Sequence, residues 1–286
     1  MKTKEILFKG LLVATITGMV LASCKKEEKE DQDTSTASDN AMAEQMYDDA
    51  SKISDEAATG SVSSFKQEST DGLLASSCAQ VKLDTANNAN EDTITVTFGI
   101  GTYPNLTNCL CSDSRFRRGQ IIITYSGRYR DSASTHTITF NNFFVNDNQI
   151  LGSKTVTNMG HNSSGHLTFN VSVSGQIILA GSGGSIIWNS TRTREWLQGE
   201  NTPFIWFDDV YGITGSASGT GAKGNSFTAV ITKQIKVKLN CKWLTEGTLE
   251  LTPSGKPVRT IDYGDGSCDN KATVTIKGHP YTVTMK

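Results

Sequence analysis

The sequence predicts an all-β fold, a large antiparallel meander that forms a curved sheet, a sandwich or a partial barrel, with one N-terminal helix. From about residue 78, apolar and polar residues alternate with period two, as at 93–98, 135–140 and 273–276. Short segments rich in Asn, Gly, Asp and Ser separate these runs and are typical of turns. Because these connections hold no convincing crossover helix, we expect neighbouring strands to be antiparallel.

The N-terminus has the layout of a bacterial signal peptide. Basic residues open the chain, and a mostly apolar stretch at 6–22 ends in Leu21-Ala22-Ser23-Cys24. This tetrapeptide resembles the lipobox of bacterial lipoproteins, in which a peptidase cleaves before the cysteine and the sulfur receives a lipid. The resemblance implies a signal peptide at 1–23 and a lipid, palmitate included, on Cys24, which would make the membrane a lasting partner.

The segment that follows Cys24 is strongly charged. Residues 24–40 lack aromatic side chains and are rich in Asp, Glu, Ser and Thr, so we expect an acidic, disordered tether. The net charge of −2 conceals an uneven distribution, because residues 25–60 carry −7 and residues 61–286 carry +3. A β region this close to neutral has no basic footprint for nucleic acid, which excludes that class of partner.

A helix is expected at 41–60. Asn40 is suited to cap its start and Gly60 to end it. Helical spacing places five apolar residues on one stripe, namely Met42, Met46, Ala50, Ile53 and Ala57. A helix of this length is marginal by itself, so the stripe should pack on the β region or on a partner.

The N-terminal features together resemble a Bacteroidota-type surface lipoprotein. The lipobox, the lysine-then-acidic run at 25–31 and the helical segment at 43–57 carry the resemblance, with the all-β region after them. It implies an outer-membrane protein that is lipid-anchored and exposed at the cell surface. It implies no activity and no catalytic residues.

The β domain is expected to span 61–286. Besides the runs already named, strands are expected at 119–129, 149–157, 166–174, 176–180, 184–197, 208–217, 226–239, 243–252 and 257–263. We find no repeat of 20–50 residues, so a solenoid is not supported.

Export permits disulfides among the five cysteines other than Cys24. Cys241 and Cys268 would join two strand ends. Cys78 would pin the domain entrance by pairing with Cys109 or with Cys111, and both pairings stay open. The Cys-x-Cys at 109–111 is alternatively half of a metal site, although no second pair has zinc-finger spacing.

The strand at 184–197 presents the most informative side chains for ligand binding. Trp188, Arg192, Arg194 and Trp196 share one face, and such a platform suits a sugar, a carboxylate or a phosphate. A glycan or an extracellular protein is therefore a candidate ligand. In the alternative, these residues form cross-strand ladders with Arg128 and Arg130 on a wide, wet sheet face.

The segment at 262–270 is a candidate calcium loop, because Asp262, Asp265 and Asp269 surround two glycines. The alternative is a tight turn whose Asp side chains cap backbone amides. His161 and His166 flank an expected hairpin tip, and they would share a metal only with a third ligand from elsewhere.

The function expected from the sequence is a non-catalytic surface lipoprotein that is structural or binds a ligand. The sequence has no His-Glu-x-x-His, no Gly-x-Ser-x-Gly and no Walker-type loop. The alternative is a secreted polysaccharide hydrolase, since glycosidase carboxylates need proximity in space and not in sequence. Its first candidate residues are Glu195, Glu200, Asp208 and Asp209.

Overall fold

The structure is a computed structural model, and it describes residues 31–62, 79–85, 92–127, 130–202 and 205–285. The chain divides into two compact units, Met1–Asp31 and Gln32–Lys286, and the account below concerns the second. The expected signal peptide, the lipid-attachment residue Cys24 and Cys78 lie outside the described residues. Within the described ranges, no helix has the length and apolar character that crossing a membrane requires.

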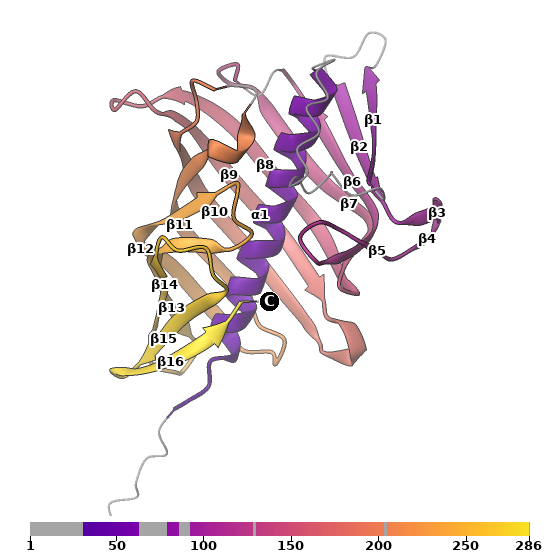
Figure 1. Cartoon of the computed structure of the whole chain (residues 1–286). Coiled ribbons are helices and arrows are strands. Elements are labelled where there is room, and N and C mark those ends of the chain that lie inside the picture. Colours follow the sequence, from indigo (N-terminus) through magenta and orange to yellow (C-terminus); the bar gives the residue numbers. More distant parts are fainter. Residues whose placement is uncertain (1–30, 63–78, 86–91, 128–129, 203–204, 286) are drawn as a thin grey trace, which may run out of the picture. The chain divides into compact units, whose positions relative to one another are not determined.

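The second unit is built on one antiparallel sheet of fourteen strands, which confirms the expected fold class (Figure 1). The strands are β1 (Ala79–Thr85), β2 (Asp92–Phe98), β5 (Cys109–Leu110), β6 (Phe116–Tyr125), β7 (Thr135–Val145), β8 (Asn148–His161), β9 (Leu167–Ile178), β10 (Ser185–Gln198), β11 (Val210–Thr220), β12 (Ser226–Lys238), β13 (Leu244–Pro253), β14 (Arg259–Asp265), β15 (Lys271–Ile276) and β16 (His279–Thr284). A separate hairpin consists of β3 (Ile100–Thr102) and β4 (Asn105–Thr107), and two short 3₁₀ helices are η1 (Ala180–Ser182) and η2 (Trp206–Asp208).

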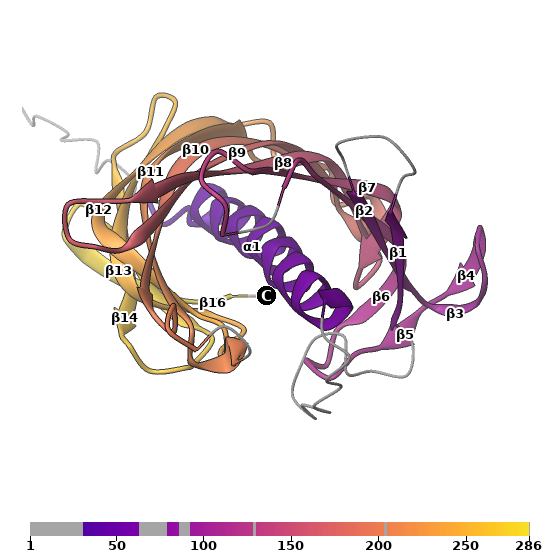
Figure 2. The same ribbon diagram turned by 90° about the horizontal axis from the view of Figure 1, so that it is seen from above.

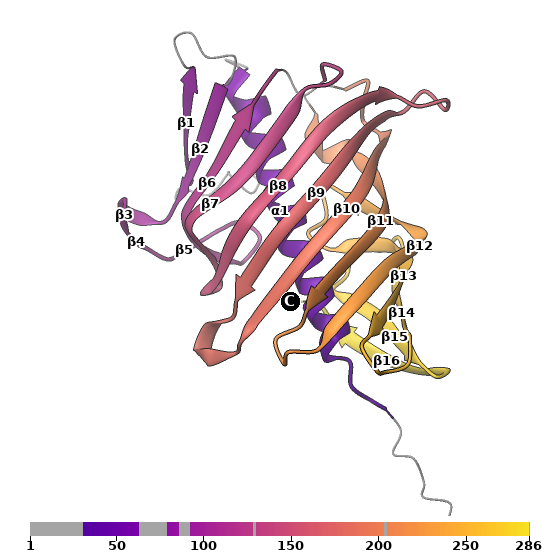
Figure 3. The same cartoon turned by 180° about the vertical axis from the view of Figure 1, so that it is seen from behind.

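The sheet is a curved meander whose strands follow one another in chain order from β1 to β16, apart from β5, which pairs only with β6 (Figure 3). It does not close on itself, because β1 and β16 stand at its two ends. Seen from above, it curls around the single helix, α1 (Figure 2). Among the three expected forms, the protein therefore adopts the curved sheet.

The helix α1 spans Ser35–Val62 and is longer than expected at both ends. The last residues of the expected tether are helical because Asp33 accepts a hydrogen bond from the amide of Ser35 (3.0 Å). The ammonium of Lys256 holds this carboxylate from the sheet side (2.6 Å). Asn40, the expected cap, lies inside the helix and is buried.

The core lies between α1 and the concave face of the sheet. Met46, Ala50, Ile53 and Ala57 of the expected stripe are buried there, and Met42 is partly buried. Polar residues on the other sides of the helix are also buried, Asp49, Ser51 and Lys52 among them. The helix is therefore enclosed by the sheet on most of its circumference.

Two strands that the sequence suggested at 166–174 and 176–180 form the single strand β9. Gly175, which separated them, is a point of close approach to the helix. A Cβ atom at this position would lie 2.0 Å from the hydroxyl of Tyr47. That hydroxyl donates to the carbonyl of Leu151 (2.8 Å), so Gly175 lets α1 contact the sheet backbone.

The cysteines follow the expected pattern in part. Cys241 and Cys268 form a disulfide with an S–S distance of 2.05 Å, as predicted. Cys109 is disulfide-bonded, whereas Cys111 carries a free and buried thiol. Of the two residues left open as partners near the domain entrance, Cys109 is therefore the one engaged.

Candidate functional site

The concave face of the sheet is the candidate site, because it gathers the buried charges of the protein. The sequence of α1 contains six acidic residues and one lysine. The β region opposite the helix contains buried basic side chains, namely Arg115, Arg117, Lys154, Arg192, Arg194 and Arg259. Opposite charges of this kind are rare in a protein interior unless they are paired.

Arg192 and Glu44 form the central pair. The guanidinium Nε and Nη2 of Arg192 donate to the two carboxylate oxygens of Glu44, at 3.1 and 2.6 Å. Both side chains are buried, and the fork-to-fork geometry is the strongest that an arginine and a carboxylate can adopt. This pair fixes the rotation of α1 against β10.

Trp188 contacts α1 one helical turn before Glu44, at Asn40. Its indole N–H donates to the side-chain oxygen of Asn40 (2.9 Å), and its ring stacks on Tyr47 with centroids 5.6 Å apart. The guanidinium of Arg192 lies 5.7 Å from the Trp188 ring. An aromatic and an arginine of β10 therefore both contact α1.

A second cluster surrounds Arg194. It donates to Asp55 of the helix (2.9 Å), and its guanidinium lies 3.5 Å from the ring centre of Tyr211. Next to it, the indole of Trp196 donates to Asp209 (3.1 Å). Trp196 also lies 4.6 Å beneath the guanidinium of Arg130.

The four side chains expected on an exposed platform are thus all buried: Trp188, Arg192 and Arg194 contact the helix, and Trp196 is packed against Tyr211 and Arg130. The exposed fractions of Trp188, Arg192, Arg194 and Trp196 are 2%, 4%, 5% and 5%. The expected open glycan-binding face is therefore corrected: α1 covers this face of β10. The side chains of β10 that the alternative placed on a wet polar face are buried as well. Of the two expected neighbours, Arg130 contacts Trp196, and Arg128 lies outside the described residues.

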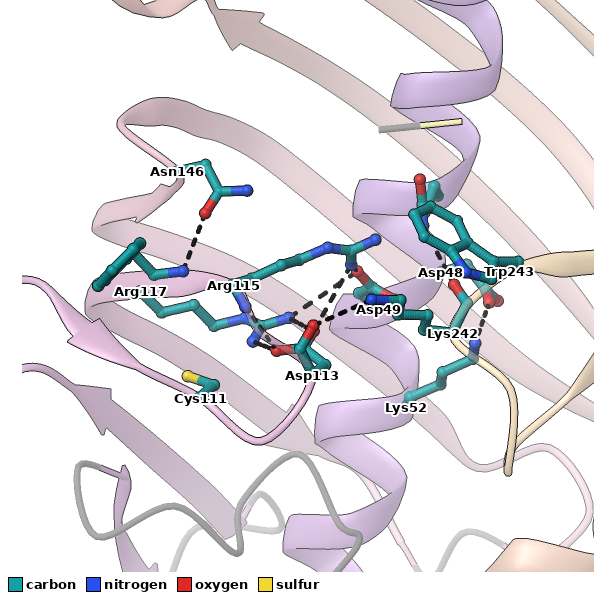
Figure 4. A network of polar contacts seen from close by, with 12 residues as sticks. Asp48, Asp49, Lys52, Cys111, Asp113, Arg115, Arg117, Asn146, Lys242 and Trp243 are labelled. Carbon is teal, nitrogen blue, oxygen red and sulfur yellow. Dashed lines mark hydrogen bonds and ion pairs between the residues drawn. The ribbon is translucent and has the colours of Figure 1, made fainter. Parts of the chain in front are cut away.

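A third cluster binds the middle of α1 to the first half of the sheet (Figure 4). Arg115 is paired with Asp49 of the helix, and Arg117 holds Asp113 through two hydrogen bonds of 2.7 Å. The exposed fraction of Arg117 is 0%. The network therefore places two guanidinium groups and two carboxylates largely out of contact with solvent, since no side chain among them is more than 7% exposed.

The loop between β12 and β13 closes over the same part of the helix. Lys52 donates to the carbonyl of Cys241 (2.9 Å), and Gln45 donates to the carbonyl of Lys242 (3.1 Å). The Lys242 ammonium reaches the carbonyl of Asp113 (3.2 Å), while Arg115 lies 5.5 Å from the Trp243 ring. We name residues 241–243 the clasp, because they join strands from both halves of the sheet across α1.

Burial and neighbouring charges shift the pKa of several groups here. Burial raises the pKa of Asp209 to about 7, and it also raises the pKa of Asp55. Burial, and next to it the positive charge of Arg194, lowers the pKa of His136 to about 4. Burial lowers the pKa of Lys154 to about 8.

A cavity of about 30 Å³ remains between α1 and β8–β12. Glu44, Lys154, Ser190 and Arg192 line it. Such a volume holds a water molecule and little more. The helix therefore fills the space in which a curved sheet of this kind would otherwise accept a ligand.

The three carboxylates of the candidate calcium loop make local hydrogen bonds to the backbone. Asp262, Asp265 and Asp269 each accept a hydrogen bond from the backbone amide two residues further on, at 2.9, 3.1 and 2.8 Å. The carboxylates cap local turns, which is the alternative stated above. No group of three or more His, Cys, Asp or Glu among the described residues is arranged to hold a metal.

The two histidines and the remaining carboxylates make separate pairs. His161 contacts Glu200 (2.6 Å) and His166 contacts Glu195 (2.8 Å). Hydrogen bonds from His166 and Asn162 lower the pKa of Glu195. Asp208 accepts from the Thr202 hydroxyl (2.8 Å), so the four candidate hydrolase carboxylates have four different local partners.

Sequence reasoning missed the helix as the partner of these arginines. The expected helix at 41–60 was assigned to packing through its apolar stripe alone, and its acidic residues were not matched with the arginines of the β region. A signal was present, because Arg192 and Arg194 share their alternation face with Ile186 and Trp188, and charged residues on a core-facing strand face require buried partners.

No family model, curated protein or solved structure matches the chain.

Proposed function

We propose that this protein is a lipid-anchored lipoprotein of the outer membrane whose β unit is non-catalytic and serves as a surface-displayed structural module. The observation that carries the proposal is the buried, charge-paired docking of α1 in the concave face of the sheet. In the sequence, α1 begins eleven residues after Cys24, and it is the first element of the described part of the chain.

The docked helix is suited to transmit an anchor's load to the sheet. Two arginines of β10 and Arg115, which directly precedes β6, contact three carboxylates of the helix, at Glu44, Asp49 and Asp55. Removing one partner of a buried pair costs about 3–5 kcal/mol, so the pairs resist sliding or rotation of the helix. A tether that joins the membrane to such a helix would hold the whole sheet at the surface.

The same docking supports a structural role over capture of a ligand in the concave face. The pocket that Glu44, Tyr47 and Asp48 of α1 line with the sheet has a volume of about 30 Å³, and Trp188 and Arg192 of β10 already contact α1. A glycan or extracellular protein partner would therefore meet the outer face or the ends of the sheet.

The hydrolase alternative finds support in one group. Asp209 has a pKa raised to about 7, which suits a general acid. Its exposed fraction is 6% and its carboxylate accepts the Trp196 indole, so a substrate would first have to displace both. We therefore favour the non-catalytic role.

The anchoring proposal is tested with Cys24→Ser in the native host. We expect the wild-type chain to incorporate labelled palmitate, to fractionate with the outer membrane and to be cut by protease added to intact cells. The Cys24→Ser variant should lose the label and leave the membrane fraction. Cys111→Ser is the matched control, because it removes a buried free thiol and should keep both properties. Retention of label and membrane association by Cys24→Ser would overturn the proposal.

A further inference from the structure

The outer face of the sheet holds a second polar site, away from α1. A pocket of about 410 Å³ lies where the ends of β10 to β14 meet. Its polar lining consists of Gln198, Lys236, Lys238, Glu246, Asp265 and Ser267. The lysines alternate along β12 with Ile235 and Val237, which face the helix side, so the lysines face outward.

Irregular strand pairing creates this hollow. The register of β12 against β13 shifts between Lys236 and Val237, and that of β13 against β14 shifts between Glu246 and Thr248. Such bulges bend a sheet locally and re-aim its side chains. They allow five strand ends to curve around one volume.

Gly266 keeps the floor of the pocket open. Its φ of +105° is a conformation that favours glycine, and a Cβ atom there would stand 3.7 Å from the Lys238 ammonium and 3.9 Å from a Glu246 oxygen. The Gly266 carbonyl accepts a hydrogen bond from Lys238 (2.7 Å). A side chain at 266 would therefore occupy the space that the charged groups surround.

The charges of the pocket balance. Lys236 pairs with Glu246 (3.1 Å), and Asp265 accepts from the amide of Ser267 (3.1 Å). With Lys238, the lining offers two ammonium groups and two carboxylates, together with the amide of Gln198. Donors and acceptors are therefore interleaved around a volume without net charge.

This lining selects among ligand classes. A simple anion would lie against Glu246 and Asp265, and a simple cation would lie against Lys236 and Lys238. An apolar molecule would leave the ion pairs without water or partners. Hydroxyl groups both donate and accept, so a neutral molecule with several of them satisfies the ammonium and carboxylate groups at once.

We propose that this outer pocket binds a small saccharide, of one or two sugar units. Lys236, Lys238 and Gln198 donate to hydroxyl oxygens, while Glu246 and Asp265 accept from hydroxyl hydrogens. The volume lies within the usual range for small-molecule sites. This inference goes beyond the anchoring role and does not depend on it, since the pocket and Cys24 are tested by different variants.

The experiment uses the full-length protein in a detergent without a sugar headgroup, and saturation-transfer NMR as the readout of binding. The probes are glucose, galactose, N-acetylglucosamine, mannose, cellobiose and chitobiose, with acetate and ethanolamine as the anion and cation arms. Lys236→Met is the pocket variant. Lys233→Met is its matched control, because Lys233 pairs with the same Glu246 carboxylate (3.0 Å) but does not line the pocket.

We expect at least one saccharide to receive saturation from the wild-type protein and to bind about tenfold more weakly to Lys236→Met, since one hydrogen bond to a charged group is lost. Lys233→Met should bind like wild type. Absence of transfer to every saccharide, equal loss in both variants, or binding of acetate or ethanolamine alone would overturn the proposal. Circular dichroism of both variants ensures that folded proteins are compared.

Discussion

At the scale of single residues, the pairing of Arg192 with Glu44 decides how α1 sits. The two residues are separated by 148 positions and make two hydrogen bonds in a buried site. Burying two charges is costly, so the pair contributes more to a unique arrangement than to net stability. Removing one of the two side chains should leave the charge of the other buried and unpaired, which lowers the free energy of unfolding.

Arg192→Met should lower the free energy of unfolding by about 3–5 kcal/mol, because Glu44 would then be buried without its cation. Urea unfolding followed by tryptophan fluorescence measures the change. The double variant with Glu44→Gln should recover a substantial part of the loss. Lys82→Met serves as control, because the Lys82–Asp84 pair is 78% and 69% exposed and should contribute below about 1 kcal/mol. Equal effects of Arg192→Met and Lys82→Met would contradict the buried pair.

Asp209 should make stability depend on pH. Its pKa is about 7 in the folded protein and 3.8 as a free side chain, so the folded state keeps a proton that the unfolded state releases. This contribution is complete below pH 4 and is lost as pH rises to 7. Asp209→Asn, which can still accept the Trp196 indole, should therefore be more stable than wild type at pH 8, by on the order of 1–2 kcal/mol.

The test compares the pH dependence of stability of Asp209→Asn with that of wild type, because His136 changes the stability of both proteins with pH in the opposite direction to Asp209. Its pKa of about 4 lies below the free value of 6.5, so its contribution is lost as pH falls through that window. Thermal unfolding at pH 4 and pH 8 separates the effects. If the advantage of Asp209→Asn were the same at both pH values, Asp209 would not be the titrating group.

Residue identities predicted these contacts only in part. The sequence singled out Trp188, Arg192, Arg194 and Trp196 as one face, and the structure does bring them together. It could not supply their partners, because alternation along a strand states which side chains share a face and not what covers that face. The partners lie some 140 positions earlier, in the helix expected at 41–60, whose apolar stripe predicted packing but did not identify which acidic side chains would meet the arginines.

At the scale of elements, Gly175 and Tyr47 set the distance between helix and sheet. Gly175→Ala would place a methyl group 2.0 Å from the Tyr47 hydroxyl, so we expect a loss of about 1–3 kcal/mol as the helix shifts. Gly127→Ala is the control, since its nearest neighbouring atom is 3.5 Å away. Urea unfolding of both variants tests this, and an equally small effect of the two would contradict close contact at Gly175.

The disulfide should stabilise the clasp. Cys241 and Cys268 close a loop with a sequence separation of 27, and the carbonyls of Cys241 and Lys242 hold Lys52 and Gln45 of the helix. Replacing both cysteines by serine should cost about 3.5 kcal/mol through chain entropy. Without the disulfide, hydrogen exchange should accelerate more at the amides of residues 45–52 than at those of β8–β10. Unchanged exchange in the helix would show that the clasp does not hold it.

Element boundaries agree with the alternation in some strands and differ in others. The central strands β7 and β8 end several residues later than expected, at Val145 and His161. The strand expected at 184–197 is β10, Ser185–Gln198. The edge strands β1 and β16 were missed: β1 lies just after residue 78, and β16 contains Pro280, which reads as a strand breaker. An edge strand tolerates proline because one of its sides makes no ladder bonds.

At the scale of the whole unit, the sheet and the helix depend on each other. The sheet does not close on itself, and its concave face carries buried arginines and a lysine among the apolar residues. Without α1, these side chains would have no second layer to pack against. The helix, with acidic residues around much of its surface, would be marginal alone. Because the helix covers the concave face, the residues of the expected ligand platform are internal. A ligand would reach the sheet from its outer face.

The central claim is that α1 is an integral part of the fold and is held in the concave face by buried charge pairs. Native-state hydrogen exchange of the full-length protein, read by mass spectrometry, tests this most directly. The account predicts that the amides of 37–57 exchange as slowly as those of β8–β10 and open only with the whole unit. Helix amides that exchange quickly while β8–β10 stay protected would contradict it.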